Sequence, residues 1–265
     1  MRWIKKFLIK IFARRLYQPF FQKLHWVALK GMNYGSANSP DDSGEAQLLT
    51  ELAEELPREP VIFDVGANTG QYTRLLLKKL SSLKPIIYLF EPDPDAYAKL
   101  VNQFGDNKMI RLNNFALGEQ IGIMQLYSYN KKGVEASLIK SHGAGQIERS
   151  VKVETIDNFC KYSGIEKIHF IKIDTEGYEI SVIRGAIKML DDNSIERIQL
   201  EHGSMNSIII GSSLYQFMQI LSRFKIFHIK QDGKFPLDFE PRFEIYYNSN
   251  YYFKLKSQSS DSVNT

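Results

Sequence analysis

The sequence contains almost no cysteine, and this limits what can stabilise the protein. Cys160 is the single cysteine among 265 residues, so the chain cannot form an internal disulfide or a zinc site built from several thiolates. The lack of disulfides is typical of a reducing compartment, and we therefore expect a cytoplasmic protein. Hydrophobic residues make up 43% of the chain, an ordinary value for a globular protein with an apolar core.

Acidic residues and long apolar runs are both absent from the first 30 residues. This segment carries eight Lys or Arg and no Asp or Glu. Basic residues interrupt the stretch MRWIKKFLIKIFARRL every few positions, which excludes a membrane-spanning helix and the apolar region of a signal peptide. The apolar residues recur at helical spacing and predict an amphipathic helix. They are Trp3, Ile4, Phe7, Leu8, Ile11 and Phe12.

Two interpretations of this basic arm stay open. The helix packs on its own domain or on a second subunit and turns its basic face to water, or it lies on an anionic membrane surface. The second interpretation predicts peripheral contact with the inner face of the membrane through residues 1–30. The pattern itself predicts no oligomeric state.

The rest of the chain is mildly acidic, with 26 basic and 30 acidic residues after residue 30. An enzyme that acts on nucleic acid usually spreads basic residues along its cleft. We therefore expect no nucleic-acid partner.

Predicted strands and helices alternate through most of the chain, which favours an α/β fold with a doubly wound, mainly parallel sheet of Rossmann-like type. The expected strands are 61–65, 86–90, 109–114, 169–174 and 195–201, and the expected helices are 71–80, 95–104, 178–190 and 213–224. Segments 122–129 and 149–156 alternate apolar and polar residues, as antiparallel hairpin strands do. A second hairpin is expected around Asn248–Asn250.

The same pattern suggests three parts. Residues 1–44 form a basic amphipathic arm and a loop, and residues 45–256 form the main domain. Residues 257–265, SQSSDSVNT, are polar and predict a disordered tail.

The stretch VIFDVGANTG follows the pattern of a strand that ends in a ligand-binding turn. Gly66 and Gly70 flank the turn, where missing side chains let a ligand approach the backbone. A dinucleotide site prefers G-x-G-x-x-G around a pyrophosphate, and this chain lacks it. It has an acid, Asp64, at the end of the strand. A carboxylate there suits a ligand with an amino group and would repel a phosphate, and S-adenosylmethionine has the first and lacks the second.

A second acid follows 21 residues after Gly70, at the end of the next predicted strand. Glu91, in LFEPDPDA, is placed to accept hydrogen bonds from both hydroxyls of a ribose. This feature is common to sites for NAD and for S-adenosylmethionine. The plainer alternative is that Asp64 and Glu91 only cap the helices that follow.

Five motifs follow one another in the order typical of FkbM-type methyltransferases, and the chain resembles this family over roughly residues 45–255. The motifs are VIFDVGANTGQYT, FEPDPDA, NFALGE, VETIDNF and IKIDTEGYEISVIRGA. The resemblance implies a class I methyltransferase fold and an enzyme that uses S-adenosylmethionine. Members mostly methylate hydroxyls of sugars, polysaccharides or natural products, so a glycan or small-molecule acceptor is expected.

The resemblance also implies which residues bind the cofactor. The methionine part would lie against Asp64, Gly66, Ala67, Asn68 and Gly70. The ribose would lie at Glu91 and Pro92, and the adenine at Asn114, Ala116 and Leu117. The chain departs from the family pattern at Tyr178, where a small residue is common, and this side chain would reshape the acceptor side.

Acids that could act on an acceptor hydroxyl cluster after the predicted strand 169–174. Asp174 and Glu176 lie in IKIDTEGYE, at a strand end where such sheets place functional groups. His202, in LEHG, is a candidate general base because a neutral imidazole can take a proton near pH 7. These residues and Glu201 could also bind a divalent cation, but no ligand spacing supports one, so we expect no metal.

Two other functions remain as alternatives. One is a non-catalytic module with the cofactor fold, recruited to a membrane or complex by its basic arm. The other is a nucleic-acid methyltransferase, which the acidic body disfavours. The sequence also lacks the Asn/Asp-Pro-Pro-aromatic segment that amine-methylating enzymes place after the fourth strand.

Overall fold

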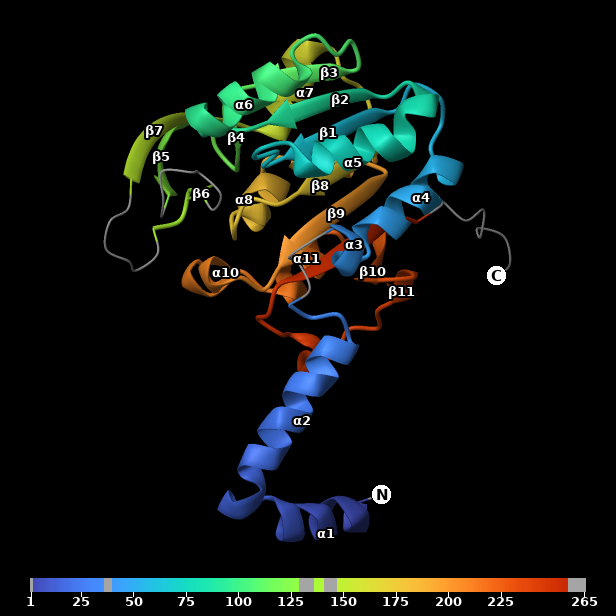
Figure 1. Ribbon diagram of the computed structural model, residues 1–265, viewed down its shortest axis with the longest axis vertical. Helices are drawn as coiled ribbons and strands as arrows, with labels where there is room; N and C mark the ends of the chain where they lie inside the picture. Colours follow the sequence, from blue (N-terminus) through green and yellow to red (C-terminus); the bar gives the residue numbers. More distant parts are fainter. Residues whose placement is uncertain (1, 36–39, 129–135, 141–146, 257–265) are drawn as a thin grey trace, which may run out of the picture.

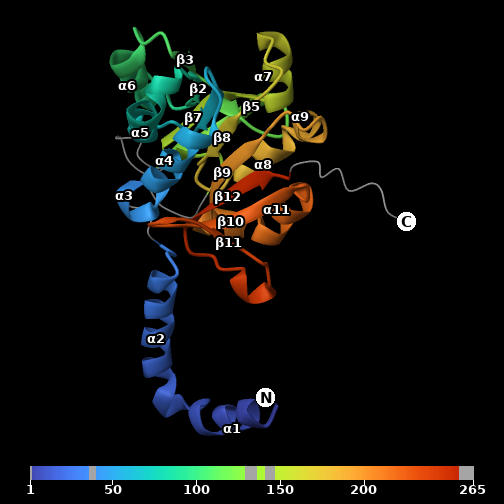
Figure 2. The ribbon, with the colours of Figure 1, turned by 90° about the vertical axis from the view of Figure 1, so that its right-hand side faces the viewer.

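The computed structural model describes residues 2–35, 40–128, 136–140 and 147–256, so the predicted tail 257–265 lies outside the described residues. Figure 1 shows an α/β body with two N-terminal helices that project from it. Figure 2 shows the helices that lie on the two sides of the sheet in this body.

The body is built on one eight-stranded sheet with the order β11-β10-β12-β9-β8-β1-β2-β3. β1 pairs in parallel with β2 on one side and with β8 on the other. Strand order therefore reverses between β1 and β8, which confirms the predicted doubly wound fold. The strands are β1 (Val61–Val65), β2 (Ile86–Phe90), β3 (Ile110–Asn113), β8 (Phe170–Ile173), β9 (Arg197–His202), β10 (Phe224–Lys230), β11 (Gly233–Pro236) and β12 (Ser249–Leu255).

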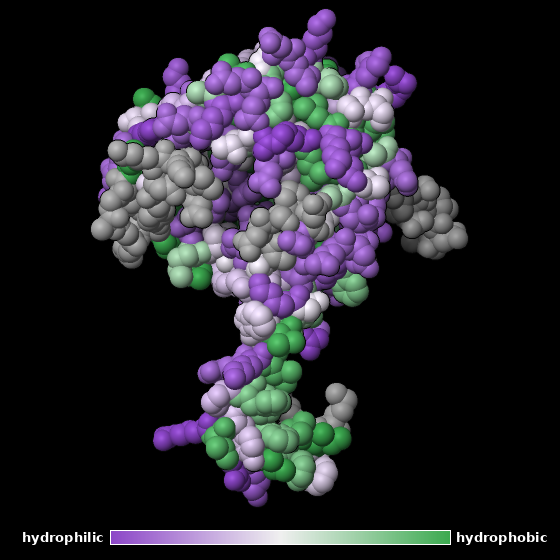
Figure 3. All heavy atoms as spheres, in the orientation of Figure 1, coloured by the Kyte–Doolittle hydropathy of each residue, from purple (hydrophilic) through white to green (hydrophobic). Residues whose placement is uncertain are grey.

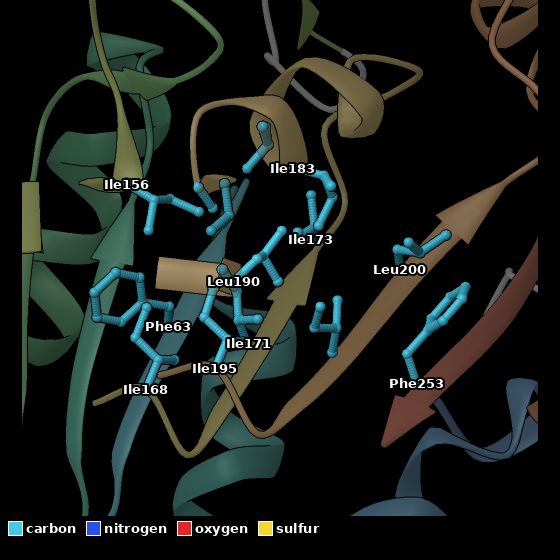
Figure 4. Packing of buried hydrophobic residues seen from close by; sticks show 14 of the residues in the cluster. Phe63, Ile156, Ile168, Ile171, Ile173, Ile183, Leu190, Ile195, Leu200 and Phe253 are labelled. Atoms are coloured by element: carbon cyan, nitrogen blue, oxygen red, sulfur yellow. The ribbon is translucent and has the colours of Figure 1, made fainter. Parts of the chain in front are cut away.

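Helices cover both faces of this sheet because successive strand residues point to opposite sides. Ile62 packs with the first group of helices, and its neighbour Phe63 packs with the second group. The first group is α4 (Glu45–Glu55), α5 (Gln71–Leu80) and α6 (Pro94–Phe104). The second group is α7 (Ile156–Ser163), α8 (Glu179–Arg184), α9 (Ile187–Asp191) and α11 (Leu214–Ile220). Figure 4 shows the second core, where Phe63, Ile171 and Ile183 come together.

A second, smaller sheet has the order β4-β7-β5-β6. β5 and β7 pair antiparallel, from Gly122 opposite Val153 to Ser128 opposite Ile147, so the predicted hairpin in the middle of the chain is confirmed. The strands of this sheet are β4 (Ala116–Leu117), β5 (Gly122–Ser128), β6 (Ala136–Ser137) and β7 (Ile147–Glu154).

The predicted hairpin around Asn248–Asn250 is wrong. β12 instead inserts antiparallel between β9 and β10. The preceding segment contains the short helix η3 (Pro241–Phe243), and the Glu244 carboxylate that follows accepts the backbone N–H groups of Leu214 and Tyr215 at the start of α11. Glu244 therefore caps α11, and residues 244–248 form no strand.

The single helix expected over 178–190 is interrupted. α8 ends before Gly185, and α9 begins at Ile187. Gly185 packs so closely on the backbone of Gly118 that a Cβ would clash with the Gly118 carbonyl oxygen. The break therefore lets the chain approach the loop after β4.

The N-terminal arm consists of α1 (Arg2–Phe12), the short helix η1 (Arg15–Tyr17) and α2 (Gln18–Gly31). Beyond residue 40 the chain continues through α3 (Pro40–Ser43) into α4. Across the ranges that the structure describes, no helix is both long and apolar enough to cross a bilayer.

The central strand β8 provides a test of the packing. Ile171 is fully buried, and we expect Ile171→Ala to lower the free energy of unfolding by about 2–5 kcal/mol because it leaves a cavity. Ile187 is 42% exposed at the start of α9, so Ile187→Ala is the matched control and should cost less than about 1 kcal/mol. Denaturant titration measures both, and equal losses would contradict this description of the core.

Candidate functional site

A cleft of about 220 Å³ opens at the carboxyl ends of β1, β2 and β8. This is the edge above the point where strand order reverses, the usual ligand position in such sheets. Leu126 and Ala136 of the small sheet line the opposite wall. The two sheets therefore enclose the cleft between them.

The turn after β1 forms the floor of the cleft. Gly66 has a φ of 79°, and a Cβ at this position would clash with the carbonyl oxygen of Asp174. The N–H groups of Gly66 and Ala67 both donate to the carbonyl oxygen of Phe90, at 3.0 and 3.1 Å. Three strand ends thus meet at one glycine. Only a residue without a side chain fits both the close approach and the left-handed conformation.

Gly70, the second predicted glycine, has a different role. It directly precedes α5 with a φ of 79°, and a Cβ there would clash with the ring of Phe104. Gly70 therefore fixes the packing of α5 on α6 and does not line the cleft.

Glu91 lies at the cleft on the end of β2. Its Oε2 accepts the N–H of Asn68 at 2.7 Å, and its Oε1 accepts the N–H of Asp93 at 2.8 Å. These bonds hold the carboxylate in one orientation and leave lone pairs on both oxygens. Burial raises the pKa of Glu91 to about 7, although the two N–H groups oppose the shift.

Asp64 is buried beneath the turn and does not line the cleft. Its Oδ2 accepts the hydroxyl of Thr73 at 2.7 Å. Its Oδ1 has no hydrogen-bond partner among the described residues. Burial raises the pKa of Asp64, and the nearby charge of Lys172 opposes this. Asp64 therefore contacts Thr73 and lies near the charge of Lys172, but it has no direct access to the cleft.

Of the residues predicted to bind the adenine, two line the cleft and one lies outside it. Ala116 and Leu117 line the cleft, as Pro92 does beside Glu91. Asn114 lies outside it, and its Nδ2 donates to the carbonyl oxygen of Glu91 at 2.8 Å. Asn114 therefore holds the loop that carries Glu91.

Lys172 and Asp174 form an ion pair at the cleft, with 2.9 Å between Nζ and Oδ2. Burial opposes the charge of Lys172, but the carboxylates of Asp174, Asp64 and Glu45 outweigh it and raise the pKa of the lysine. Burial likewise opposes ionisation of Asp174, yet the charge and hydrogen bond of Lys172 lower its pKa. Glu201 hydrogen-bonds to Asp174, and burial raises its pKa well above the usual range. We therefore assign an ionised Asp174 between a charged lysine and a protonated Glu201.

Glu176 lines the cleft from a constrained turn. Its φ of 54° is unusual for a residue with a side chain. Two hydrogen bonds to its carbonyl oxygen fix this geometry, from Ser137 Oγ at 2.9 Å and Asn206 Nδ2 at 2.7 Å. Glu179 closes the turn by accepting the N–H groups of Thr175 and Gly177, both at 2.9 Å. The turn therefore presents Asp174 and Glu176 to the cleft in a fixed arrangement.

His202 lies outside the cleft and is 1% exposed. Its Nε2 lies 3.4 Å from Oε1 of Glu244. Its ring packs near the rings of Phe217 and Tyr246, with centroids 5.6 Å away in each case. His202 instead lines a second, smaller cavity together with Glu176 and Glu201, so its role as a general base stays a prediction.

Several residues of the cleft were not predicted from the sequence. Lys172 is the most important of them, and the pattern that could have indicated it is a charged residue within the apolar strand segment FIKI. Glu45 and Tyr72 line the cleft from α4 and α5, and Leu126 and Leu138 line it from the region of the small sheet. Within the described ranges, no group of three or more His, Cys, Asp or Glu is placed to hold a metal ion.

Much of the chain matches a known protein family. The family model described as the methyltransferase FkbM domain matches residues 64–225. The hexuronic acid methyltransferase AglP of Haloferax volcanii is 25% identical over 169 residues, which are 62% of this chain and 65% of that protein. The 2-O-methyltransferase NoeI of Sinorhizobium fredii is 28% identical over 146 residues, which are 50% of this chain and 59% of that protein. The matches thus span less than two thirds of either relative.

Among solved structures, a methyltransferase FkbM from Methylobacillus flagellatus aligns with 77% of this chain and 50% of its own. The sequence identity is 16% and the TM-score is 0.47.

The raised pKa of Glu91 predicts a pH dependence of stability. The folded protein binds this proton more tightly than the unfolded chain, where the pKa stays near the ordinary value of 4.5. The contribution of protonated Glu91 to stability is therefore complete at low pH and is lost as the pH rises through 7. Between about pH 4.5 and pH 8, we expect the free energy of unfolding of the wild type to fall by about 3 kcal/mol relative to Glu91→Gln. Parallel pH curves from urea denaturation would contradict this.

Proposed function

The chain belongs to the FkbM methyltransferase family, and from this premise we propose that it transfers a methyl group from S-adenosylmethionine to a hydroxyl of a sugar or glycan. The observation that carries the proposal is an acid-lined cleft above the point where strand order reverses, inside the matched family domain. The two relatives are a hexuronic acid methyltransferase and a 2-O-methyltransferase, which supports a sugar acceptor.

The charges around the cleft fit S-adenosylmethionine better than a dinucleotide. Among the described residues, its walls carry one cationic side chain, Lys172. The acids that line it are Glu45, Glu91, Asp174 and Glu176. This excess of carboxylates would repel a pyrophosphate and would favour a ligand that carries positive charge.

Distinct parts of the cleft suit distinct parts of this cofactor. Glu91 keeps lone pairs for two ribose hydroxyls, because each of its oxygens accepts only one backbone N–H. Ala116 and Leu117 offer an apolar wall for the adenine. The turn from Gly66 to Asn68 offers bare backbone to the methionine part, close to the ion pair of Lys172 with Asp174.

S-adenosylmethionine supplies an electrophilic methyl group when it is bound. The chain's own contribution is to hold an acceptor hydroxyl in line and to take its proton. Asp174 is ionised and fixed by Lys172, so it suits a hydrogen bond that orients the hydroxyl. Glu176 lines the same wall on a rigid turn, and we assign it the proton that leaves the acceptor oxygen.

The cofactor assignment predicts a pH-dependent affinity. Ionised Glu91 accepts the ribose hydroxyls, and its pKa of about 7 means that it is mostly protonated at pH 6. We expect S-adenosylhomocysteine to bind up to about tenfold more weakly at pH 6 than at pH 8. Equilibrium dialysis measures the dissociation constant at each pH.

The matched variants for this prediction are Glu91→Gln and Glu119→Gln. Glu91→Gln should bind weakly at both pH values, whereas Glu119 is exposed and its substitution should leave the wild-type pH profile unchanged. A wild-type profile in Glu91→Gln would remove Glu91 from the ribose site.

The catalytic assignment predicts a separation of binding from turnover. Glu176→Gln should lower kcat by about 10²-fold or more because it removes a proton acceptor, while the affinity for S-adenosylhomocysteine stays within about twofold. The assay follows S-adenosylhomocysteine formed with uronic-acid oligosaccharides and with neutral hexose oligosaccharides. Glu119→Gln is again the control. Full turnover by Glu176→Gln would refute the role given to Glu176. Cofactor binding by the wild type without turnover on any acceptor would favour the non-catalytic alternative.

A further inference from the structure

The N-terminal arm carries an apolar surface that the body does not cover. α1 and α2 lead away from the body in both ribbon views, and Figure 3 shows hydrophobic residues gathered over this part of the molecule. Of the side chains described in these two helices, Leu29 alone is buried. We call the following six residues the arm surface, and their exposed fractions run from 46% to 81%: Trp3, Ile4, Phe7, Leu8, Leu16 and Phe20.

Basic residues accompany this surface. Residues 1–30 contain eight Lys or Arg and no Asp or Glu. On α1, Lys6 and Lys10 are exposed and lie one turn apart, and Lys6 lies on the side away from Ile4 and Leu8. An exposed amphipathic helix whose charged residues are all basic has the character of a helix that lies in a membrane interface.

The bend between the two helices is packed. The ring of Phe12 makes edge-on contacts with Tyr17 and Phe21, at centroid distances of 5.7 and 5.8 Å. Each such edge-on contact stabilises the bend beyond the effect of burying the rings. The arm therefore presents α1 in a defined direction.

The root of the arm is built into the body. Asn33 Nδ2 donates to the carbonyl oxygens of Ser43 and Ile229, both at 3.0 Å, and Tyr34 is 1% exposed. Ser43 Oγ in turn donates to Glu45 at 2.9 Å, and Glu45 lines the cleft. If the arm binds a surface, the body is therefore held in a fixed orientation relative to that surface.

We propose that the arm surface docks on an anionic lipid bilayer, with α1 lying in the interface. The bilayer is the occupant that meets both features, because acyl chains take up the apolar side chains and anionic headgroups attract the basic ones. A second copy joined arm to arm would bring together two segments with eight basic residues each and no acid. The chain's own body is not the occupant, since the arm points away from it (Figures 1 and 2). This proposal does not rest on the reaction in the cleft.

Co-sedimentation of the full chain with lipid vesicles tests the proposal. We expect binding to vesicles of phosphatidylcholine mixed with phosphatidylglycerol and little binding to phosphatidylcholine alone. The double variant Phe7→Ser/Leu8→Ser should partition roughly tenfold or more weakly, because two apolar anchors are lost. Lys6→Gln and Lys10→Gln should each weaken partitioning by roughly fivefold at low salt.

The matched control is Ile123→Ser, which removes an apolar side chain that is 74% exposed on the body. It should partition as the wild type does. All the substituted side chains are exposed, so thermal unfolding should stay unchanged and exclude misfolding as a cause. Unaltered partitioning of the Phe7→Ser/Leu8→Ser variant would overturn the proposal. So would self-association of the wild type that depends on Phe7 and Leu8 without any binding to vesicles.

Discussion

The close packing of the Gly66 backbone on the carbonyl oxygen of Asp174 is the contact on which the cleft depends. It brings the ends of β1 and β8 together at the point where strand order reverses. The hydrogen bonds from Gly66 and Ala67 to Phe90 add the end of β2. The loops that follow β1, β2 and β8 all start from this point. The position of Glu91 relative to Asp174 therefore follows from backbone geometry. A side chain at residue 66 would separate the loops before it met any ligand.

Buried charges of opposite sign also stabilise the ends of these strands. Lys172 is held in the sheet by the carboxylates of Asp174, Asp64 and Glu45. A lone charge of either sign would be costly at this depth, so each member requires the others. Asp174 stays ionised because of Lys172, whereas burial raises the pKa of Glu201 well above its usual range. The polar core is therefore part of the chemistry proposed for the cleft as well as part of the fold.

Local sequence patterns predicted the elements of the fold well, because each strand and helix is specified by its own apolar spacing. They predicted Glu91 and the Gly66 turn for the same reason, since both stand directly at strand ends. The patterns failed where distant segments meet. Nothing within residues 243–255 shows that β12 inserts between β9 and β10, because this pairing depends on strands far away in the chain. Lys172 was missed because only the folded sheet places acids around it. His202 stands at a strand end as the acids do, but Glu244 and the surrounding rings enclose it.

The proposed role of the cleft above Gly66 is to bind S-adenosylmethionine. Calorimetric titration of the purified protein with S-adenosylhomocysteine, with NAD and NADP as comparison ligands, tests this binding most directly. We expect saturable binding of S-adenosylhomocysteine at one site per chain and no heat from either dinucleotide, because carboxylates line the cleft. Binding of NAD or NADP in its place, or of none of the three, would show that the cleft does not bind S-adenosylmethionine.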